Sequence, residues 1–408
     1  MPKIQSITCH KIVNSRGDWT IETKVSLDDG SEGVQAIPEG ASKGEHEAVY
    51  IPVEKAVEIV SLPINDALKN EDPLDQDVLD NILISMDGTS NKRHLGGNSI
   101  LSVSLAVAQA AAKSKGLELY EYLSFLYSGE KLPKKDLEFP IPVFNVLNGG
   151  KHAHNNLSFQ EFMVIPAKGT PYDKCMEMGV DVYHELKKRL MEKGLDVNVG
   201  DEGGFAPTGF TVRKAFDFVR GAAKVKYKVG EELFLGADVA AGSFYNNEHY
   251  NLKEENLVLT NKELVGYHSK LLKDYELIYF EDPFYEKDTE GWEMFYEKMS
   301  KKLMVVADDL VVTNYKFLKK AIDKKLANAV IVKPNQVGTL TETFRFIREA
   351  KKAGMSVIVS HRSGDTAEDT FIADLALAVR ADFIKAGAPV RGERVVKYNR
   401  LLDVFNQA

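Results

Sequence analysis

Residues 276–283 read ELIYFEDP, an apolar run that ends in the carboxylates of Glu281 and Asp282. Six further runs between about position 197 and position 387 have the same form, a few apolar residues and then an ionisable side chain. They are VNVGDE (197–202), ELFLGAD (232–238), LMVVADD (303–309), AVIVKPNQ (329–336), SVIVSHRS (356–363) and FIKAGAP (383–389). Short runs of this kind are typical of strands that are buried on both faces.

The spacing of these runs predicts a barrel. Segments of helical pattern separate them, so their charged ends follow one another at intervals of roughly 25 to 45 residues, as in repeated strand–helix units. In a (β/α)8 barrel the carboxyl ends of the strands converge on the face that holds the active site. We therefore expect these acids and bases to share one pocket, although an acidic residue also often begins an ordinary loop.

The composition and net charge indicate which kinds of binding partner and which cellular compartment to expect. The 408 residues are 44% hydrophobic and 27% charged, which is ordinary for a globular chain of two domains. The net charge of −8 argues against a nucleic-acid partner or an anionic membrane, because no basic block is present to bind phosphates. With only Cys9 and Cys175, no signal-peptide pattern and no apolar stretch of membrane-spanning length, we expect a cytoplasmic protein.

The first third of the chain has a different pattern from the rest. Residues 3–37 alternate as three antiparallel strands do, and Asp29-Gly30 supplies a hairpin turn. The stretch 53–127 is helical in pattern, and Asn98 is the predicted N-cap of its most apolar helix. Strands followed by helices indicate an α+β module.

A charged connection, SGEKLPKKDLEFP (128–140), contains proline and glycine and follows this module. We therefore predict an α+β capping domain over residues 1–130 and a catalytic barrel domain over residues 138–408.

Asp238, Glu281 and Asp308 stand at the ends of three of the predicted strands. Hard oxygen ligands of this kind suit Mg²⁺, which keeps positions open for water and substrate; three unrelated loop-facing acids are the alternative. Lys333 and Lys385 lie within two other apolar runs, where burial or a cationic neighbour lowers the pKa of a lysine toward that of a usable base. A structural salt bridge to one of the carboxylates is the alternative for each lysine.

The run SVIVSHRS delivers His361, Arg362 and Ser363, a predicted anion cradle in which Arg offers a bidentate fork and Ser a hydroxyl donor. Glu161, in LSFQEFMVIP, and Glu202, in GDEGGF, are candidate general acids. Each of these two is, taken alone, equally an ordinary strand-end carboxylate.

Two loops add candidates of less specific pattern. His152 and His154 lie in NGGKHAHNN, where a histidine is often simply solvated. Residues 40–44, GASKG, form a small-residue loop that allows close backbone approach to an anion or metal and can hinge as a lid. A plain surface turn has the same composition.

Taken together, these motifs resemble the enolase family over essentially the whole chain. The matching stretches include NSRGDWTIE, PEGASKGEHEA, DGTSNKRHLGGNSILSVSLA, IPVFNVLNGGKHA, QEFMVIP, VGDEGGFAP, YFEDPF, ADDLVVTN, VKPNQVGT, VSHRSGDTAEDTFIADLA and IKAGAPVRGERVVKYNRLL. The resemblance implies an N-terminal α+β cap and a C-terminal enolase-type (β/α)8 barrel whose second strand runs antiparallel. It also implies the reversible, Mg²⁺-dependent dehydration of 2-phosphoglycerate to phosphoenolpyruvate, a step of glycolysis and gluconeogenesis, with two Mg²⁺ per site.

The same resemblance implies a role for each motif residue. The first Mg²⁺ would be held by Asp238, Glu281 and Asp308, and the second by Ser42 of the closing loop. Lys333 would remove the proton from carbon 2, Glu202 would protonate the departing hydroxide, and Glu161 and His152 would assist. The substrate would be contacted by Gln160, His361, Arg362, Ser363, Lys385 and Ser42.

Several positions depart from the family pattern. Glu39 stands where a Ser is usual and Lys43 where a Thr is usual, both in the lid loop, and Trp19 replaces a usual Pro. Gly242-Ser243 stands where Ser-Glu is common. A usual segment after the lid loop is absent, because AVYIPVEKAVEIV runs directly into a helical pattern.

These departures keep other functions open. One alternative is an enolase-like paralogue of weak or no catalysis that acts as a binding or scaffold protein. Another is an acid-sugar dehydratase or racemase of the wider superfamily, against which the phosphate cradle at Arg362 and Ser363 argues. For the favoured function we expect a small phosphorylated hydroxy-acid substrate, no nucleic-acid or membrane partner, and a homo-oligomer, either a dimer or an octamer.

Overall fold

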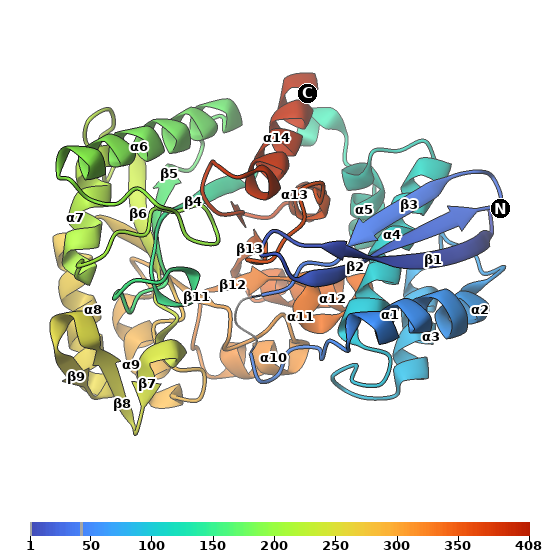
Figure 1. Cartoon of the computed structure of the whole chain (residues 1–408), viewed down its shortest axis with the longest axis horizontal. Helices are drawn as coiled ribbons and strands as arrows, with labels where there is room; N and C mark the ends of the chain where they lie inside the picture. Colours follow the sequence, from blue (N-terminus) through green and yellow to red (C-terminus); the bar gives the residue numbers. More distant parts are fainter. Residues whose placement is uncertain (1, 41–43) are drawn as a thin grey trace.

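The N-terminal part of the chain is a sheet beside a group of helices. The computed structural model describes residues 2–40 and 44–408. The sheet has the antiparallel order β1-β2-β3, which confirms the predicted strands, and Figure 1 shows it next to helices α1 to α5. The elements are β1 (Ile4–Val13), β2 (Trp19–Leu27), β3 (Glu32–Ala36), α1 (Val53–Ile59), a π-helical turn (Val60–Ile64), α2 (Asn65–Leu68), α3 (Gln76–Asp87), α4 (Gly97–Ser114) and α5 (Leu119–Ser128).

Helix α4 packs directly on this sheet, and at Gly33 the two backbones come especially close. A Cβ at Gly33 of β3 would lie 2.0 Å from the carbonyl oxygen of Ala106, so only glycine allows the two backbones to approach this closely. Across the same interface the Thr23 hydroxyl donates a hydrogen bond of 2.7 Å to Ser102 Oγ. Almost every residue of α4 is buried as a result.

The predicted N-cap of this helix was wrong. Gly96, with a φ of 90°, precedes α4, and Asn98 lies inside the first turn. The Asn98 amide instead pairs with the backbone of Ile51, donating at 3.1 Å and accepting at 3.2 Å. The side chain of Asn98 is therefore used in a long-range pairing with Ile51 and not as the cap that the local pattern predicted.

The rest of the chain forms a closed eight-stranded barrel surrounded by helices, as predicted. The barrel strands are β4 (Ile141–Asn148), β5 (Glu161–Pro166), β6 (Leu233–Asp238), β10 (Leu277–Glu281), β11 (Met304–Ala307), β12 (Ala329–Val332), β13 (Ser356–Ser360) and β14 (Phe383–Lys385). The helices are α6 (Tyr172–Glu192), α7 (Val212–Ala223), α8 (Asn261–Asp274), α9 (Thr289–Met299), α10 (Tyr315–Asp323), α11 (Pro334–Val337), α12 (Leu340–Lys352), α13 (Phe371–Ala378) and α14 (Gly392–Gln407). A small separate sheet holds β7 (Tyr245–Asn246), β8 (His249–Leu252) and β9 (Leu257–Leu259). Short 3-10 turns lie at Lys134–Asp136, Gly150–His152, Ala241–Phe244 and Lys253–Glu255.

Strand β5 runs antiparallel to both of its neighbours, β4 and β6, as the resemblance implied. Its first residue, Glu161, is therefore paired with the last residues of those strands, Asn148 and Asp238. The reversal places the beginning of β5 at the end of the barrel where the other strands finish.

One of the seven apolar runs is not a barrel strand. Residues 197–202, VNVGDE, form a loop with only an isolated bridge from Val199 to Phe205, and Val199 is 39% exposed. Two valines around an exposed asparagine are too short a run to span the barrel wall. Strands β4 and β5 fill the first two barrel positions instead, and the loop still delivers Glu202 to the barrel mouth.

The two parts of the chain are joined by buried hydrogen bonds at the start of α12. The backbone N–H of Leu340 donates to Ser104 Oγ at 3.0 Å, and that of Thr341 donates to Asp80 Oδ2 at 2.9 Å. Ser104 and Asp80 belong to helices of the N-terminal part and are completely or nearly completely buried. The first N–H groups of a helix have no partner within it, so these acceptors satisfy them.

Within the described ranges, we find no helix with both the length and the apolar character that crossing a bilayer requires.

Candidate active site

The predicted functional side chains meet at one end of the barrel. Asp238, Glu281 and Lys385 end β6, β10 and β14, whereas Asp308 and Lys333 directly follow β11 and β12. A cavity of about 160 Å³ is lined there by His152, Gln160, Glu161, Glu202, Asp238, Asp308, Lys333, His361, Arg362, Ser363 and Lys385. Glu281 is completely buried behind them. Loops after parallel strands therefore bring together residues that lie far apart in the sequence.

Lys385 is the central cation of the cavity. Its Nζ lies 2.8 Å from Glu281, 3.1 Å from Glu161 and 3.2 Å from Asp238. Burial lowers the pKa of this lysine, but the three carboxylates outweigh burial and raise the pKa well above its ordinary value. Burial and then the neighbouring charge of Asp238 raise the pKa of Glu281 to about 8.

Lys333 forms an ion pair with Asp308. Burial alone would lower the pKa of Lys333, yet contact with Asp308 raises it above the ordinary value. Conversely, Lys333 holds the pKa of Asp308 below its usual value against the effect of burial. Arg362 and Lys385 act on Lys333 in the opposite direction, since like charges favour loss of a proton.

The carboxylates fit a divalent cation by their donor chemistry. Asp238, Glu281 and Asp308 offer hard oxygen atoms at successive strand ends. Glu281 Oε1 is buried and has no hydrogen-bond partner among residues 2–40 and 44–408, whereas Glu281 Oε2 accepts hydrogen bonds from Tyr279 and Lys385. A buried carboxylate oxygen without a donor is costly, and a cation would satisfy it.

A neighbouring set of acids, Asp282, Asp308 and Asp309, brings ligand atoms within 4.8 Å of one another and could also hold a metal ion. Asp282 already accepts the backbone N–H groups of Asp308 at 3.0 Å and Asp309 at 2.8 Å. Gln336 Nε2 donates to Asp308 Oδ1 at 2.9 Å. Asp282 therefore fixes the backbone that carries Asp308, and Gln336 fixes the Asp308 side chain.

Arg362 faces an acid that the sequence did not place near it. Glu47 Oε2 lies 2.9 Å from Arg362 Nη1, and Glu47 Oε1 lies 3.3 Å from Nη2. Both side chains are nearly completely buried. Gly40 packs against the same guanidinium, since a Cβ there would lie 2.0 Å from Nη2. The predicted anion cradle is therefore filled by a carboxylate from the segment after the lid loop.

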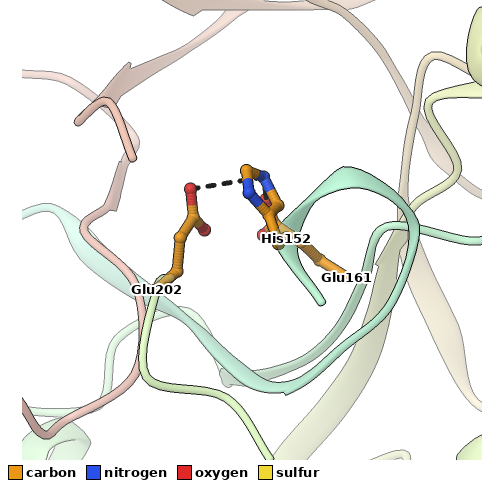
Figure 2. A group of neighbouring side chains, drawn as sticks. All are labelled: His152, Glu161 and Glu202. Atoms are coloured by element: carbon orange, nitrogen blue, oxygen red, sulfur yellow. Dashed lines mark ion pairs between the residues drawn. The ribbon is translucent and has the colours of Figure 1, made fainter. Parts of the chain in front are cut away.

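Two glutamates that line the cavity lie beside one histidine, as Figure 2 shows. His152 Nε2 lies 3.4 Å from Glu202 Oε1 and 3.6 Å from Glu161 Oε1, and this set could likewise hold a metal ion. Burial and then the charge of Glu202 raise the pKa of Glu161 well above its ordinary value. Burial would raise the pKa of Glu202 too, but His152, His361 and Arg394 outweigh burial and hold it well below the ordinary value. Carboxyl groups whose pKa values are displaced in opposite directions are typical of acid–base pairs.

Comparison with known families agrees with this geometry. Residues 4–123 match a family model described as the enolase N-terminal domain, and residues 136–407 match one described as the enolase C-terminal TIM barrel domain. The chain belongs to the enolase family. Enolase domains of this kind indicate an enzyme of lyase type, and the acidic groups at the barrel mouth are consistent with the metal dependence of the family.

The departures at Glu39, Gly242 and Ser243 lie around the cavity mouth, whereas Trp19 is an exposed residue of β2. The backbone of Glu39 forms a two-way bridge with Gly364, at 2.8 and 2.7 Å, beside the cradle residues. Gly242 and Ser243 line the cavity, and a Cβ at Gly242 would lie 3.2 Å from Glu286 Oε2. Ser42, the predicted ligand of a second Mg²⁺, and Lys43 lie outside the described residues, and α1 begins soon after, at Val53.

Several residues of this enolase-family site were not assigned from the sequence. They are Glu47, Asn145, Asp282, Gln336 and Arg394, each of which contacts a predicted site residue. All five fall inside quoted motifs, but only Asp282 and Gln336 are close in sequence to an assigned residue, Glu281 and Lys333 respectively, and that closeness was an available signal. Glu47 and Arg394 pair with residues far away along the chain, and no local pattern reveals such pairs. His154, by contrast, is exposed, as expected of a solvated loop histidine.

Proposed function

We propose that this member of the enolase family catalyses the Mg²⁺-dependent, reversible dehydration of 2-phospho-D-glycerate to phosphoenolpyruvate. The observation that supports it most is the gathering of cations and candidate acids in one cavity. Lys333, Lys385 and Arg362 bring three cations to it, and Glu161 and Glu202 bring a pair of carboxyl groups, with Lys385 Nζ 3.1 Å from Glu161. Removing a proton beside a carboxylate develops a second negative charge, which only concentrated positive charge stabilises.

Binding would begin with the charged groups of the substrate. Arg362 and Ser363 would hold the phosphate, which must first replace the Glu47 carboxylate at the guanidinium. Lys385 would pair with the substrate carboxylate, with Gln160 beside it. Asp238, Glu281 and Asp308 would hold the first Mg²⁺, which when bound supplies positive charge next to that carboxylate.

Lys333 would act as the base at carbon 2. Its ammonium group must lose a proton to do so, and Arg362 and Lys385 both favour that loss. Asp308 opposes it, so the base becomes active when Asp308 is engaged elsewhere. Glu202 would take up a proton and then donate it to the departing hydroxide. Glu161 and His152 lie beside Glu202, and the three groups together can hold one proton and pass it between them.

The test follows the ultraviolet absorbance of phosphoenolpyruvate formed from 2-phosphoglycerate with and without Mg²⁺. We expect turnover that requires Mg²⁺ and that disappears with a chelator. If the protein unfolds cooperatively on heating, and is therefore folded, absence of turnover would reject the proposal.

The ion pair between Arg362 and Glu47 supports a second candidate, an enolase-like protein that binds partners and does not catalyse. A cradle filled by its own carboxylate binds phosphate less readily. Calorimetry with a phosphonohydroxamate mimic of the reaction intermediate separates the two candidates. Tight, Mg²⁺-dependent binding would exclude the scaffold-only alternative.

We also propose that the protein works in the cytoplasm as a homo-oligomer. Cys9 and Cys175 are both free thiols, which suits a reducing compartment. Val13 and Trp19, cross-strand neighbours on β1 and β2, are 54% and 56% exposed and offer an apolar contact for a second copy. Light scattering should give the mass of an oligomer that Trp19→Glu reduces; an unchanged mass would place the contact elsewhere.

A further inference from the structure

Arg394 is a completely buried cation that no step of the proposed reaction uses. It lies in the first turn of α14 and reaches the loop that follows β13. Its Nη1 lies 2.6 Å from His361 Nδ1 and donates to the carbonyl of Arg362 at 2.7 Å. Its Nη2 donates to the carbonyl of Ser363 and, at 3.3 Å, to that of Asp201. One guanidinium therefore contacts both the cradle loop and the residue before Glu202.

The contact with His361 fixes where the imidazole carries its proton. A guanidinium has five N–H donors and no acceptor, so the ring nitrogen that faces it must be the acceptor. Nδ1 of His361 therefore carries no hydrogen, and the proton of the neutral ring is on Nε2. The imidazolium form, with a hydrogen on both nitrogens, is incompatible with the same contact. Burial lowers the pKa of His361 to about 4, with Glu202 and Asp365 opposing and Arg394 reinforcing the shift.

The Nε2 atom of His361 lies beside one particular oxygen of Glu202. Nε2 lies 3.4 Å from Glu202 Oε2, which also accepts a hydrogen bond of 3.1 Å from Asn145 Nδ2. Two N–H groups face this oxygen, so a proton on the carboxyl belongs on Oε1. Oε1 is the oxygen that faces His152.

Ion pairing alone does not account for the burial of Arg394. Its nearest counter-charge is Asp365, at 3.6 Å, but Lys397 already pairs with Asp365 at 2.7 Å. The backbone also makes room for the side chain at Gly387, which has a φ of 86°. A Cβ there would lie 2.8 Å from the Glu202 carbonyl and 3.0 Å from Arg394 Cδ.

We propose that Arg394 is a positioning residue of this site. It holds His361 as the neutral Nε2–H tautomer, which directs a proton on Glu202 to Oε1, and it fixes the backbone of residues 361–363 for phosphate. The effect of Arg394 on catalysis rests on the proposed function. The tautomer of His361 does not, because it can be observed in the protein without substrate.

Nitrogen-15 NMR of histidine-labelled protein tests the tautomer directly, with His361→Gln used to assign the signal. We expect His361 to be neutral with its hydrogen on Nε2 at pH 7. A hydrogen on Nδ1, or an imidazolium signal at pH 7, would overturn the proposal. If Arg394→Gln does not fold, this spectrum of the unmodified protein still decides the tautomer.

In folded Arg394→Gln the His361 signal should change tautomer or begin to titrate. Arg400→Gln is the matched control, because Arg400 lies on the same helix and pairs with Asp374 at 2.6 Å, away from the cavity. It should leave the His361 signal unchanged. An unchanged signal in Arg394→Gln as well would show that other contacts set the tautomer.

Kinetics test the positioning role. Arg394→Lys keeps the charge but loses the planar fork, so we expect kcat for dehydration to fall about 100-fold, as misplaced groups commonly cost. Exchange of the proton on carbon 2 should persist, because Lys333 is not disturbed, and Arg400→Lys should behave like the unmodified protein. Unchanged kcat in Arg394→Lys would reject the role. If even the unmodified protein fails to dehydrate 2-phosphoglycerate, the proposed function fails and the NMR result stands by itself.

Discussion

Lys333 and Asp308 form an ion pair between the ends of two adjacent strands, and both side chains are largely buried. Each is the main counter-charge of the other, so the pairing sets the pKa of both groups. The predicted base of the reaction is thus held in its charged form by a predicted metal ligand.

Lys333→Ala should abolish exchange of the carbon-2 proton of 2-phosphoglycerate while Mg²⁺ binding persists. A general base contributes about 10²- to 10⁴-fold to a rate, and exchange in deuterated water, followed by NMR, should fall by that order. Calorimetry would measure Mg²⁺ binding, and Lys316→Ala, on the exposed face of α10, is the control. Exchange at the normal rate in Lys333→Ala would assign the base elsewhere.

Glu202→Gln should separate the two halves of the reaction. Carbon-2 exchange should continue, because Lys333 is intact, whereas formation of phosphoenolpyruvate should fall about 10²- to 10⁴-fold for lack of an acid. Comparing exchange with product formation in one sample measures both. Equal loss of both activities would contradict our division of base and acid between these residues.

Glu281→Gln should remove the stabilisation that Mg²⁺ gives to the unmodified protein. A ligand that binds only the folded state at 100 times its Kd stabilises that state by about 2.7 kcal/mol, which calorimetric melting detects. The variant should melt at the same temperature with Mg²⁺ or with chelator. Glu293→Gln, an exposed acid on α9, should respond to Mg²⁺ as the unmodified protein does; a Mg²⁺-responsive Glu281→Gln would place the ion elsewhere.

His268 should make the fold sensitive to acid. The ring is completely buried, its Nε2 lies 3.1 Å from the Pro283 carbonyl, and burial lowers its pKa to about 3 from 6.5. Between these values the unfolded chain binds a proton that the native state does not. Stability is therefore lost as pH falls below about 6.5, by about 1.4 kcal/mol per pH unit.

His268→Phe removes this titration and tests the sign of the effect. At pH 7.5 the variant should be less stable by about 1 kcal/mol, because the Pro283 carbonyl loses its donor. Between pH 6.5 and 4.5 it should lose about 2 to 3 kcal/mol less than the unmodified protein, as urea unfolding at each pH would measure. His154→Gln, at an exposed position, should not alter the slope. Parallel pH profiles for His268→Phe and the unmodified protein would contradict the assignment.

Two glycines should respond to alanine in opposite directions. Gly266 lies inside α8 with open space around its Cα, so Gly266→Ala should stabilise the protein by about 1 kcal/mol through helix propensity. Gly33→Ala should destabilise it by about 1 to 3 kcal/mol or more, because the new methyl group meets the backbone of α4. Urea unfolding measures both; a stabilised Gly33→Ala would mean that β3 and α4 separate easily.

Much of this fold is visible in the sequence because barrel strands have a distinctive local pattern. The run 276–283 and five of the six others lie at barrel strands, since burial on both faces requires apolar residues throughout. The run 197–202 failed because two valines suffice to imitate the pattern but not to span the barrel wall. Asn98 failed as an N-cap because its amide pairs with Ile51, which lies 47 residues away.

In the candidate site, too, some residues can be predicted from the sequence and others cannot. Residues at strand ends, such as Asp238 and Lys385, are predictable because the barrel converts position along the sequence into position in space. The pairing of Glu47 with Arg362 spans 315 residues, and that of Arg394 with His361 joins a helix to a loop. Such contacts depend on how separate elements dock, and no short stretch of sequence encodes them.

The hydrogen bonds that α12 donates to Ser104 and Asp80 have a consequence for how the molecule melts. If the cap separated from the barrel, the N–H groups of Leu340 and Thr341 and the carboxylate of Asp80 would lose their hydrogen-bond partners. Water could replace these partners only after the whole interface between the two parts had opened. Heating should therefore give one calorimetric peak rather than two, so that a chain matching two family models behaves in thermal unfolding as a single cooperative unit.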